Sequence, residues 1–157
     1  MTNSVNEATE FDPLKLEHQL CFRLYSASRK MTRAYQPILE QHGLTYPQYI
    51  LLMIMWAHES IDFKELSQII DLKTATLTPI VQKLVVLGYA NKEKNPDDGR
   101  KINVSLTKRG KDLKEVLKHV PKDLATCVDL EQERYRALIN ELDHLMEKLA
   151  KYESRQT

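Results

Sequence analysis

The fold is decided by residues 63–110, which read FKELSQIIDLKTATLTPIVQKLVVLGYANKEKNPDDGRKINVSLTKRG. The residue before this stretch, Asp62, is a helix-capping residue with Glu65 three positions on, which predicts a first short helix ending at Asp71. That helix would turn three apolar side chains inward, namely Leu66, Ile69 and Ile70.

A second helix is predicted almost at once. It begins near Thr74 and ends at Gly88, the residue best able to adopt the left-handed cap conformation. Its apolar positions at helical spacing are Ile80, Val81, Leu84 and Leu87. Pro79 cannot donate a backbone hydrogen bond, so the helix either begins irregularly or starts later than Thr74. Strands over 89–94 and 101–106 then flank a turn-rich loop, which predicts a hairpin with charge at its tip.

The order helix, tight turn, helix and basic hairpin is typical of a winged helix-turn-helix. In that fold the second helix enters a DNA major groove and the hairpin follows the backbone. Residues 61–111 carry ten Lys or Arg and six Asp or Glu, a net charge of +4 in a chain whose net charge is +1. The positive charge therefore lies on the segment expected to meet phosphate.

Length and composition limit the class of protein. A chain of 157 residues with 42% hydrophobic residues fits one domain, with the winged helix-turn-helix over 45–106 and dimerisation helices over 13–36 and 107–152. The longest apolar run, Tyr49 to Ala57, is too short to cross a bilayer, and Met1 to Phe11 lacks the pattern of a secretory signal. We therefore expect a cytoplasmic protein without a membrane partner. The five histidines show no ligand spacing and no catalytic motif occurs, so we expect no metal, no cofactor and no enzymatic activity.

Helices with apolar seams are predicted at both ends of the chain. Asp12-Pro13 is a good helix start, and Pro37 and then Gly43 interrupt the pattern after it. The seam of this helix comprises Leu20, Leu24, Ala27, Met31 and Ala34, beside a stripe of Cys21, Tyr25, Ser28, Thr32 and Tyr35. Thr45 to Gln48 has the form of a capping box for a buried helix that runs to about Ala57.

The C-terminal part is also predicted to be helical. Thr107 caps a helix that Pro121 should break or bend, and the last helix starts at Asp129. That helix carries a heptad seam of Tyr135, Leu138, Leu142, Leu145, Leu149 and Tyr152. Both seams could fold back onto their own subunit. A homodimer is favoured, because two-fold symmetry supplies the second recognition helix that a palindromic site requires.

From about Leu14 to Tyr152 the chain resembles the MarR transcriptional regulators. The specific part is Asp98-Gly-Arg100 followed by residues 104–110, VSLTKRG, which is similar to that family's wing signature. Leu77-Thr78-Pro79 and the cysteine near the N-terminus are similar to the organic hydroperoxide resistance branch, whose repressors sense oxidants through an N-terminal cysteine. The resemblance implies that Tyr35 and Tyr46 assist Cys21. It also implies that Cys127 of the other subunit traps the oxidised residue as a disulfide.

The geometry of the predicted N-terminal helix limits which tyrosines of the same chain can reach Cys21. Tyr35 follows Cys21 by fourteen residues on one predicted helix, which separates them by about 21 Å. The two residues therefore cannot touch within one subunit, whereas Tyr25, one turn from Cys21, can reach it. Cys21 could instead be a small core residue, and Cys127 could be a bystander beside Pro121.

Residues for DNA contact follow from the predicted recognition helix and hairpin. The polar side chains that can reach base edges are Thr74, Thr76, Thr78 and Gln82, while Lys73 and Lys83 suit phosphate. One or two of the threonines could serve only as local caps. Arg100 is expected in or beside the minor groove and paired with Asp98 when unbound, unless that pair is purely structural.

The leading hypothesis is a dimeric repressor that binds double-stranded DNA and releases a palindromic operator when an organic hydroperoxide oxidises Cys21. One alternative is a MarR-type repressor relieved by a small aromatic or phenolic ligand, with the cysteines incidental. A thiol peroxidase and a nonspecific DNA-packaging protein are the others.

Overall fold

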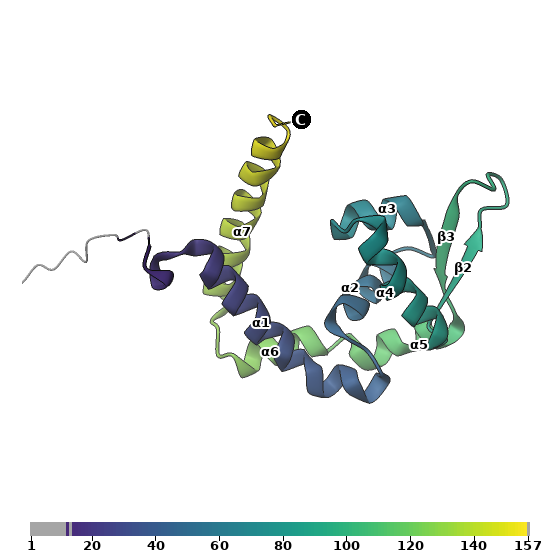
Figure 1. The fold of residues 1–157 in the computed structure, drawn as a ribbon. Coiled ribbons are helices and arrows are strands. Elements are labelled where there is room, and N and C mark those ends of the chain that lie inside the picture. Colours follow the sequence, from purple (N-terminus) through teal and green to yellow (C-terminus); the bar gives the residue numbers. More distant parts are fainter. Residues whose placement is uncertain (1–11, 13, 157) are drawn as a thin grey trace, which may run out of the picture. The chain divides into compact units, whose positions relative to one another are not determined.

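The computed structural model describes residue 12 and residues 14–156, apart from the side chain of Cys127. The described chain divides into two compact units, one up to Val116 and one from Leu117 onward. Unit 1 contains the helices α1 (Leu20–Leu39), α2 (Tyr46–Ala57), α3 (Phe63–Ile70), α4 (Thr74–Val86) and α5 (Lys108–Leu117), the last of which ends at the unit boundary. It also contains β1 (Ser60–Asp62), β2 (Ala90–Lys94) and β3 (Ile102–Leu106), shown in Figure 1.

The core of unit 1 is built around α2. Leu51 and Leu52 of this helix are fully buried, as are Leu66 of α3 and Leu84 of α4. The predicted capping box starts the helix, because Gln48 Oε1 accepts a hydrogen bond from the Thr45 amide at 2.8 Å. The predicted buried central helix is therefore confirmed, and the chain is mainly α with a small β-sheet wing.

The sheet has one strand more than the sequence predicted. Its order is β1-β3-β2, with both neighbouring pairs antiparallel. Ile61 lies opposite Val104 on one side of β3, and Lys92 lies opposite Val104 on the other. β1 contains only three residues and runs directly into the Asp62 cap of α3, so its sequence shows no alternating pattern to detect.

The N-terminal helix begins later and ends later than predicted. Asp12 Oδ1 accepts from the Leu14 amide, which makes a turn instead of a helix cap, and the extended backbone of Gln19 delays α1 until Leu20. Pro13 lies outside the described residues. Pro37 does not end α1, which continues through it to Leu39. Leu39 is buried, and this packing offsets the backbone hydrogen bond that a proline removes.

Other boundaries also differ from the predictions. Ile69 of α3 is about half exposed instead of turned inward, and the buried residues of this helix are Phe63 and Leu66. Pro79 lies inside α4, yet the helix starts at Thr74, so a later start is wrong.

Unit 2 contains α6 (Val120–Cys127) and α7 (Gln132–Glu153). Pro121 lies in the first turn of α6, where its missing amide costs no helical hydrogen bond, so the break precedes it. The last helix starts at Gln132 instead of Asp129, whose φ is +52°.

The heptad seam of α7 contains no buried residue. Tyr135, Leu138, Leu149 and Tyr152 are between 41% and 61% exposed. Among residues 12 and 14–156, no helix combines the length and apolar character needed to cross a bilayer.

Candidate nucleic-acid interface and thiol site

The helix-turn-helix is formed by α3 and α4. Asp62 caps α3 by accepting hydrogen bonds from the amides of Lys64 at 2.8 Å and Glu65 at 3.3 Å. Asp71 ends the helix in the left-handed conformation, and the Ser67 hydroxyl donates to the Leu72 carbonyl across the turn. These local bonds allow only three residues between the two helices, which fixes α4 against α3.

The outer face of α4 carries the predicted DNA-contacting side chains. Lys73, Thr74, Thr76, Gln82 and Lys83 are exposed. The opposite face is anchored by Leu77, Val81 and Leu84, which are fully buried. Thr78 differs from the other threonines, because its hydroxyl donates to the Thr74 carbonyl at 2.8 Å and the residue is half-buried. Of the predicted base-contacting threonines, Thr74 and Thr76 are the more accessible.

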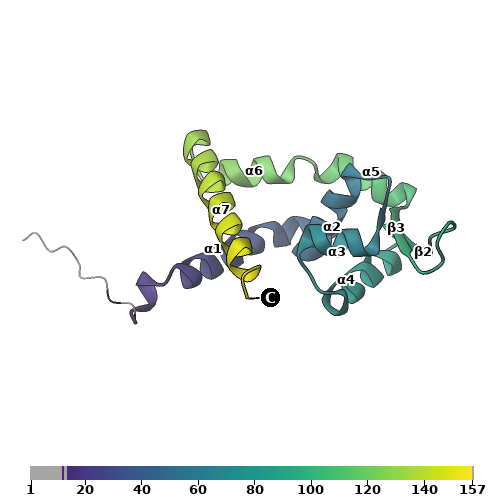
Figure 2. The same cartoon turned by 90° about the horizontal axis from the view of Figure 1, so that it is seen from above.

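The hairpin loop is shaped by its own side chains. Asn95 Oδ1 accepts from the amides of Asp97 and Asp98, and Asp98 Oδ1 accepts from the Arg100 amide at 3.1 Å. The described contact between Asp98 and Arg100 therefore uses the backbone of Arg100, whose side chain is exposed. Figures 1 and 2 both show the hairpin projecting beyond α3 and α4, which leaves its tip open to a partner.

Two cations at the wing, which sequence analysis did not single out, lie over aromatic rings. Lys92 of β2 is 4.9 Å from the ring centroid of Phe63, and the Arg109 guanidinium is 4.8 Å from that of Tyr89. Both contacts are short enough to contribute a cation–π attraction. They attach the hairpin to the helices beneath it.

Cys21 is the second residue of α1 and is exposed. This placement excludes a buried core role within the described chain. It also puts the thiol in the first turn of a helix, at the positive end of the helix dipole. Tyr25, one turn on, is exposed too, but its hydroxyl accepts a hydrogen bond from Arg29 Nη1 at 3.0 Å.

The predicted pair of sensor tyrosines lies together. The ring centroids of Tyr35, on α1, and Tyr46, at the start of α2, are 4.9 Å apart. Tyr49 completes the cluster, with centroid distances of 5.8 Å to Tyr35 and 6.4 Å to Tyr46. It is only 1% exposed, and burial, followed by the charge of Tyr46, raises the pKa of its phenol. Sequence analysis missed Tyr49, although its three-residue spacing from Tyr46 on one helix is a detectable signal.

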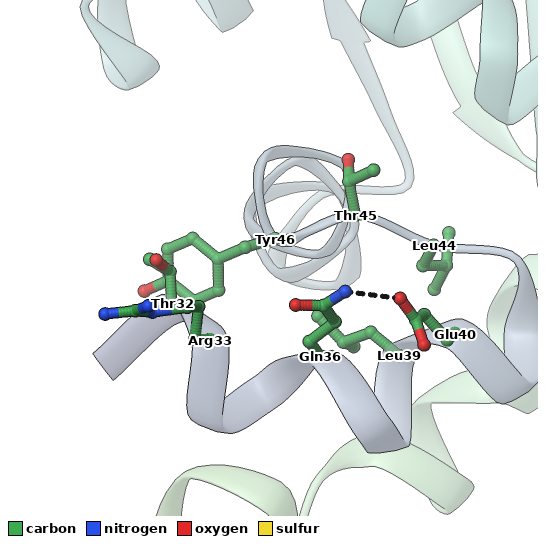
Figure 3. Close-up of a pocket in the computed structure, with 8 residues that line it drawn as sticks. All are labelled: Thr32, Arg33, Gln36, Leu39, Glu40, Leu44, Thr45 and Tyr46. Carbon is green, nitrogen blue, oxygen red and sulfur yellow. Dashed lines mark hydrogen bonds between the residues drawn. The ribbon is translucent and has the colours of Figure 1, made fainter. Parts of the chain in front are cut away.

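Beside this cluster, α1, the segment after it and the start of α2 line an open hollow of about 250 Å³. Figure 3 shows Tyr46 extending from α2 toward Thr32 and Arg33 of α1, while Gln36 and Glu40 are hydrogen-bonded to each other. Tyr46 therefore lies at the junction between the N-terminal helix and the central helix.

The other predicted thiol, Cys127, is the last residue of α6. Its side chain lies outside the described part of the structure. Among the described residues, no group of three or more His, Cys, Asp or Glu is arranged to hold a metal ion.

The chain is similar in sequence to known transcriptional regulators. A family model described as the transcriptional regulators SarA/Rot matches residues 33–117. The organic hydroperoxide resistance transcriptional regulator of Bacillus subtilis is 36% identical over 140 residues, which are 89% of this chain and 95% of that protein. This chain belongs to the MarR family of transcriptional regulators, in the organic hydroperoxide resistance branch.

Solved structures of relatives match this MarR-family regulator over most of its length. Reduced AbfR bound to DNA is 28% identical and has a TM-score of 0.72, over 86% of this chain and 94% of that chain. AbfR with a disulfide formed is 30% identical, with a TM-score of 0.63 over 84% of this chain and 92% of that chain. The winged helix-turn-helix predicted from the sequence is thereby confirmed.

Proposed function

We propose that this MarR-family regulator is a homodimeric repressor whose affinity for a palindromic operator is controlled by oxidation of Cys21. The observation that carries the proposal is the exposed thiol in the first turn of α1, together with the packed phenols of Tyr35 and Tyr46. The relatives support it, since AbfR has been solved both reduced on DNA and in a disulfide form.

DNA contact is assigned to the outer face of α4 and to the tip of the hairpin. Thr74, Thr76 and Gln82 would contact base edges, while Lys73 and Lys83 would neutralise phosphates. Arg100 would lie in or beside the minor groove. The buried residues of α4 would keep these side chains at one fixed orientation, which sequence-specific contacts need.

The sensor is assembled across the dimer. Cys21 and Tyr35 are fourteen residues apart on α1, about 21 Å along one helix, so the phenols of one chain would serve the thiol of the partner. The exposed seams of α1 and α7 supply the apolar surface for that dimer. Two-fold symmetry then gives two recognition helices for two half-sites.

Organic hydroperoxide is the proposed signal. The Cys21 thiolate attacks the terminal peroxide oxygen and the O–O bond breaks, which leaves a cysteine sulfenic acid and an alkoxide. The alkoxide takes up the proton that the thiol had lost and becomes an alcohol. The thiol of Cys127 from the other subunit then displaces water from the sulfenic acid and forms a disulfide. This rearrangement would change the spacing of the recognition helices. A difference of a few kcal/mol in operator-binding free energy between the reduced and oxidised forms would then empty the operator.

A gel shift tests the proposal. Wild-type protein should bind a palindromic operator fragment, release it after one equivalent of cumene hydroperoxide per subunit, and bind again after a thiol reductant. Cys21→Ser should bind and stay bound. Release by the Cys21→Ser protein on peroxide treatment would overturn the redox mechanism.

Ligand response in the gel shift, peroxide consumption and footprinting separate the alternatives. A repressor relieved by a small aromatic anion would respond to that ligand in the Cys21→Ser protein as in the wild type. The hollow beside Tyr46 is one space where such a ligand would be sought. A thiol peroxidase would consume many equivalents of peroxide with a reductant, and a packaging protein would give no sharp footprint.

A further inference from the structure

We propose that Tyr49 is the positioning residue for the sensor phenols of Tyr35 and Tyr46, and that Trp56 connects this aromatic cluster to the base of the wing. The inference rests on the proposed function, because a positioning role requires that the two phenols act on Cys21. Tyr49 would be a residue that the sensor needs, and Trp56 would couple movement of the sensor to the DNA-binding elements.

Tyr49 is the buried member of the aromatic cluster. Tyr35 and Tyr46 come from different helices and are both partly exposed, whereas Tyr49 is 1% exposed. Its ring is within 6.4 Å, centroid to centroid, of both phenols and is tilted against each. Tilted rings at such distances attract one another through edge and face. Each sensor phenol is therefore held by two neighbouring rings, and Tyr49 is the one fixed in the core.

Tyr49 and Trp56 share one side of α2. Residues three and seven positions apart lie on the same face of a helix, which aligns Tyr46, Tyr49 and Trp56. The rings of Tyr49 and Trp56 meet edge to face, with centroids 6.1 Å apart. A displacement of the phenol cluster is therefore passed along α2 by direct ring contact.

A hydrogen bond anchors the indole of Trp56. Its indole Nε1 donates to the Gly110 carbonyl at 2.9 Å, across 54 residues of sequence. Gly110 in turn donates its amide to Thr107 Oγ1, and the Thr107 hydroxyl donates to the Gly88 carbonyl at 2.7 Å. Gly88 follows the end of α4, and Thr107 follows the end of β3. Trp56 is thus bonded to the junction where the recognition helix and the wing meet.

Reaction rates test the positioning role. The second-order rate constant for oxidation of Cys21 by cumene hydroperoxide is measured across pH in full-length protein. We expect Tyr49→Leu to lower this rate constant about tenfold, because small displacements of assisting groups slow a reaction. Tyr49→Phe should keep the wild-type rate constant, because its ring contacts remain. Operator affinity of the reduced variants serves as the check of folding. Where the Leu variant does not bind, Tyr49→Met, whose unbranched and flexible side chain can adapt to the space left by the ring, replaces it.

A matched control separates positioning from general loss of packing. Leu51 is fully buried in the same helix but lies about 200° around it from Tyr49. Leu51→Ala should weaken the fold and leave the oxidation rate within about twofold of the wild type. An equal loss of rate in Leu51→Ala, or a wild-type rate in Tyr49→Leu and Tyr49→Met, overturns the inference while the proposed function stands. A wild-type protein that does not react overturns both.

Fluorescence tests the connection to the wing. Trp56 is the single tryptophan of the chain, so the intrinsic emission of the protein reports on its hydrogen bond to Gly110. Stoichiometric cumene hydroperoxide should change the emission of the wild type and leave Cys21→Ser unchanged. Identical emission of reduced and oxidised wild type overturns the connection.

Discussion

Burial changes the acid–base behaviour of Tyr49. Desolvation of the phenolate and the charge of Tyr46 raise its pKa above the usual value of about 10. The neutral phenol is therefore the form that the fold favours. Its contribution to stability is fully present below the usual value and is lost as pH rises through the raised one. The free energy of unfolding of the wild type should therefore fall above about pH 10 more steeply than that of Tyr49→Phe.

Urea unfolding at several pH values measures this difference. Parallel curves for the wild type and Tyr49→Phe would contradict a pKa raised by burial.

Arg100 is expected to bind DNA without choosing its sequence. Its side chain is exposed at the hairpin tip, and only its backbone amide is used by Asp98. Arg100→Ala should weaken binding to operator and non-operator DNA alike and reduce the salt slope by about one. Titrations at several salt concentrations measure both effects, with Lys148→Ala on α7 as the charge-matched control. A loss confined to the operator would point to direct base contact instead.

At the scale of elements, the glycine of the wing signature has a steric explanation. A Cβ built on Gly110 would lie 2.0 Å from the Tyr89 carbonyl oxygen, which is backbone and cannot swing aside. The start of α5 is therefore pressed against the start of β2, where Trp56 also bonds. Gly110→Ala should cost about 3 kcal/mol of folding free energy, the upper end of overpacking.

Gly99 is the matched control for this prediction. Nothing lies within 4 Å of a Cβ built there, so Gly99→Ala should change stability by less than about 0.5 kcal/mol. Denaturant titration compares the two variants. Similar midpoints would show that α5 and β2 can separate without penalty.

Elements with strong local signals could be predicted from the sequence, and those set by distant contacts could not. The Asp62 cap and the left-handed Gly88 bound the helix-turn-helix as expected, because capping chemistry is local. Pro37 and Pro79 lie inside helices because buried neighbours, Leu39 and Leu77, compensate for the missing amides. β1 exists only through its pairing with β3, some forty residues away.

The candidate site was predictable to a similar degree. Tyr35 and Tyr46 do lie together, but the resemblance to a family suggested them, and periodicity alone would not have. Tyr49 was hidden in an apolar run, where a phenol is easily taken for one more core residue. The Arg29 contact of Tyr25 joins residues four positions apart on α1, a spacing that sequence analysis applied to Cys21 and Tyr25 alone.

At the scale of the whole molecule, the α7 seam predicts a dimer. Leu138 is 52% exposed within one chain, so a charge there costs one chain little, whereas a dimer would bury it. Leu138→Glu should shift sedimentation toward the monomer and weaken operator binding. Asn140→Glu adds the same charge about 200° around the helix and should remain dimeric. A dimeric Leu138→Glu would move the interface away from this seam.

Capture of oxidised Cys21 by the partner's Cys127 is the last step of the proposed mechanism, and it predicts a covalent dimer. One equivalent of cumene hydroperoxide per subunit should convert the monomer band on non-reducing electrophoresis to a dimer band, and a thiol reductant should reverse it. Cys127→Ser should stay monomeric on the gel, and excess oxidant should then carry Cys21 to the sulfinic and sulfonic acids, because no thiol traps the sulfenic acid. Mass spectrometry of the Cys21 peptide measures that oxidation. A wild-type protein that gives only monomer while releasing the operator would show that the sulfenic acid itself is the signal and that Cys127 is a bystander.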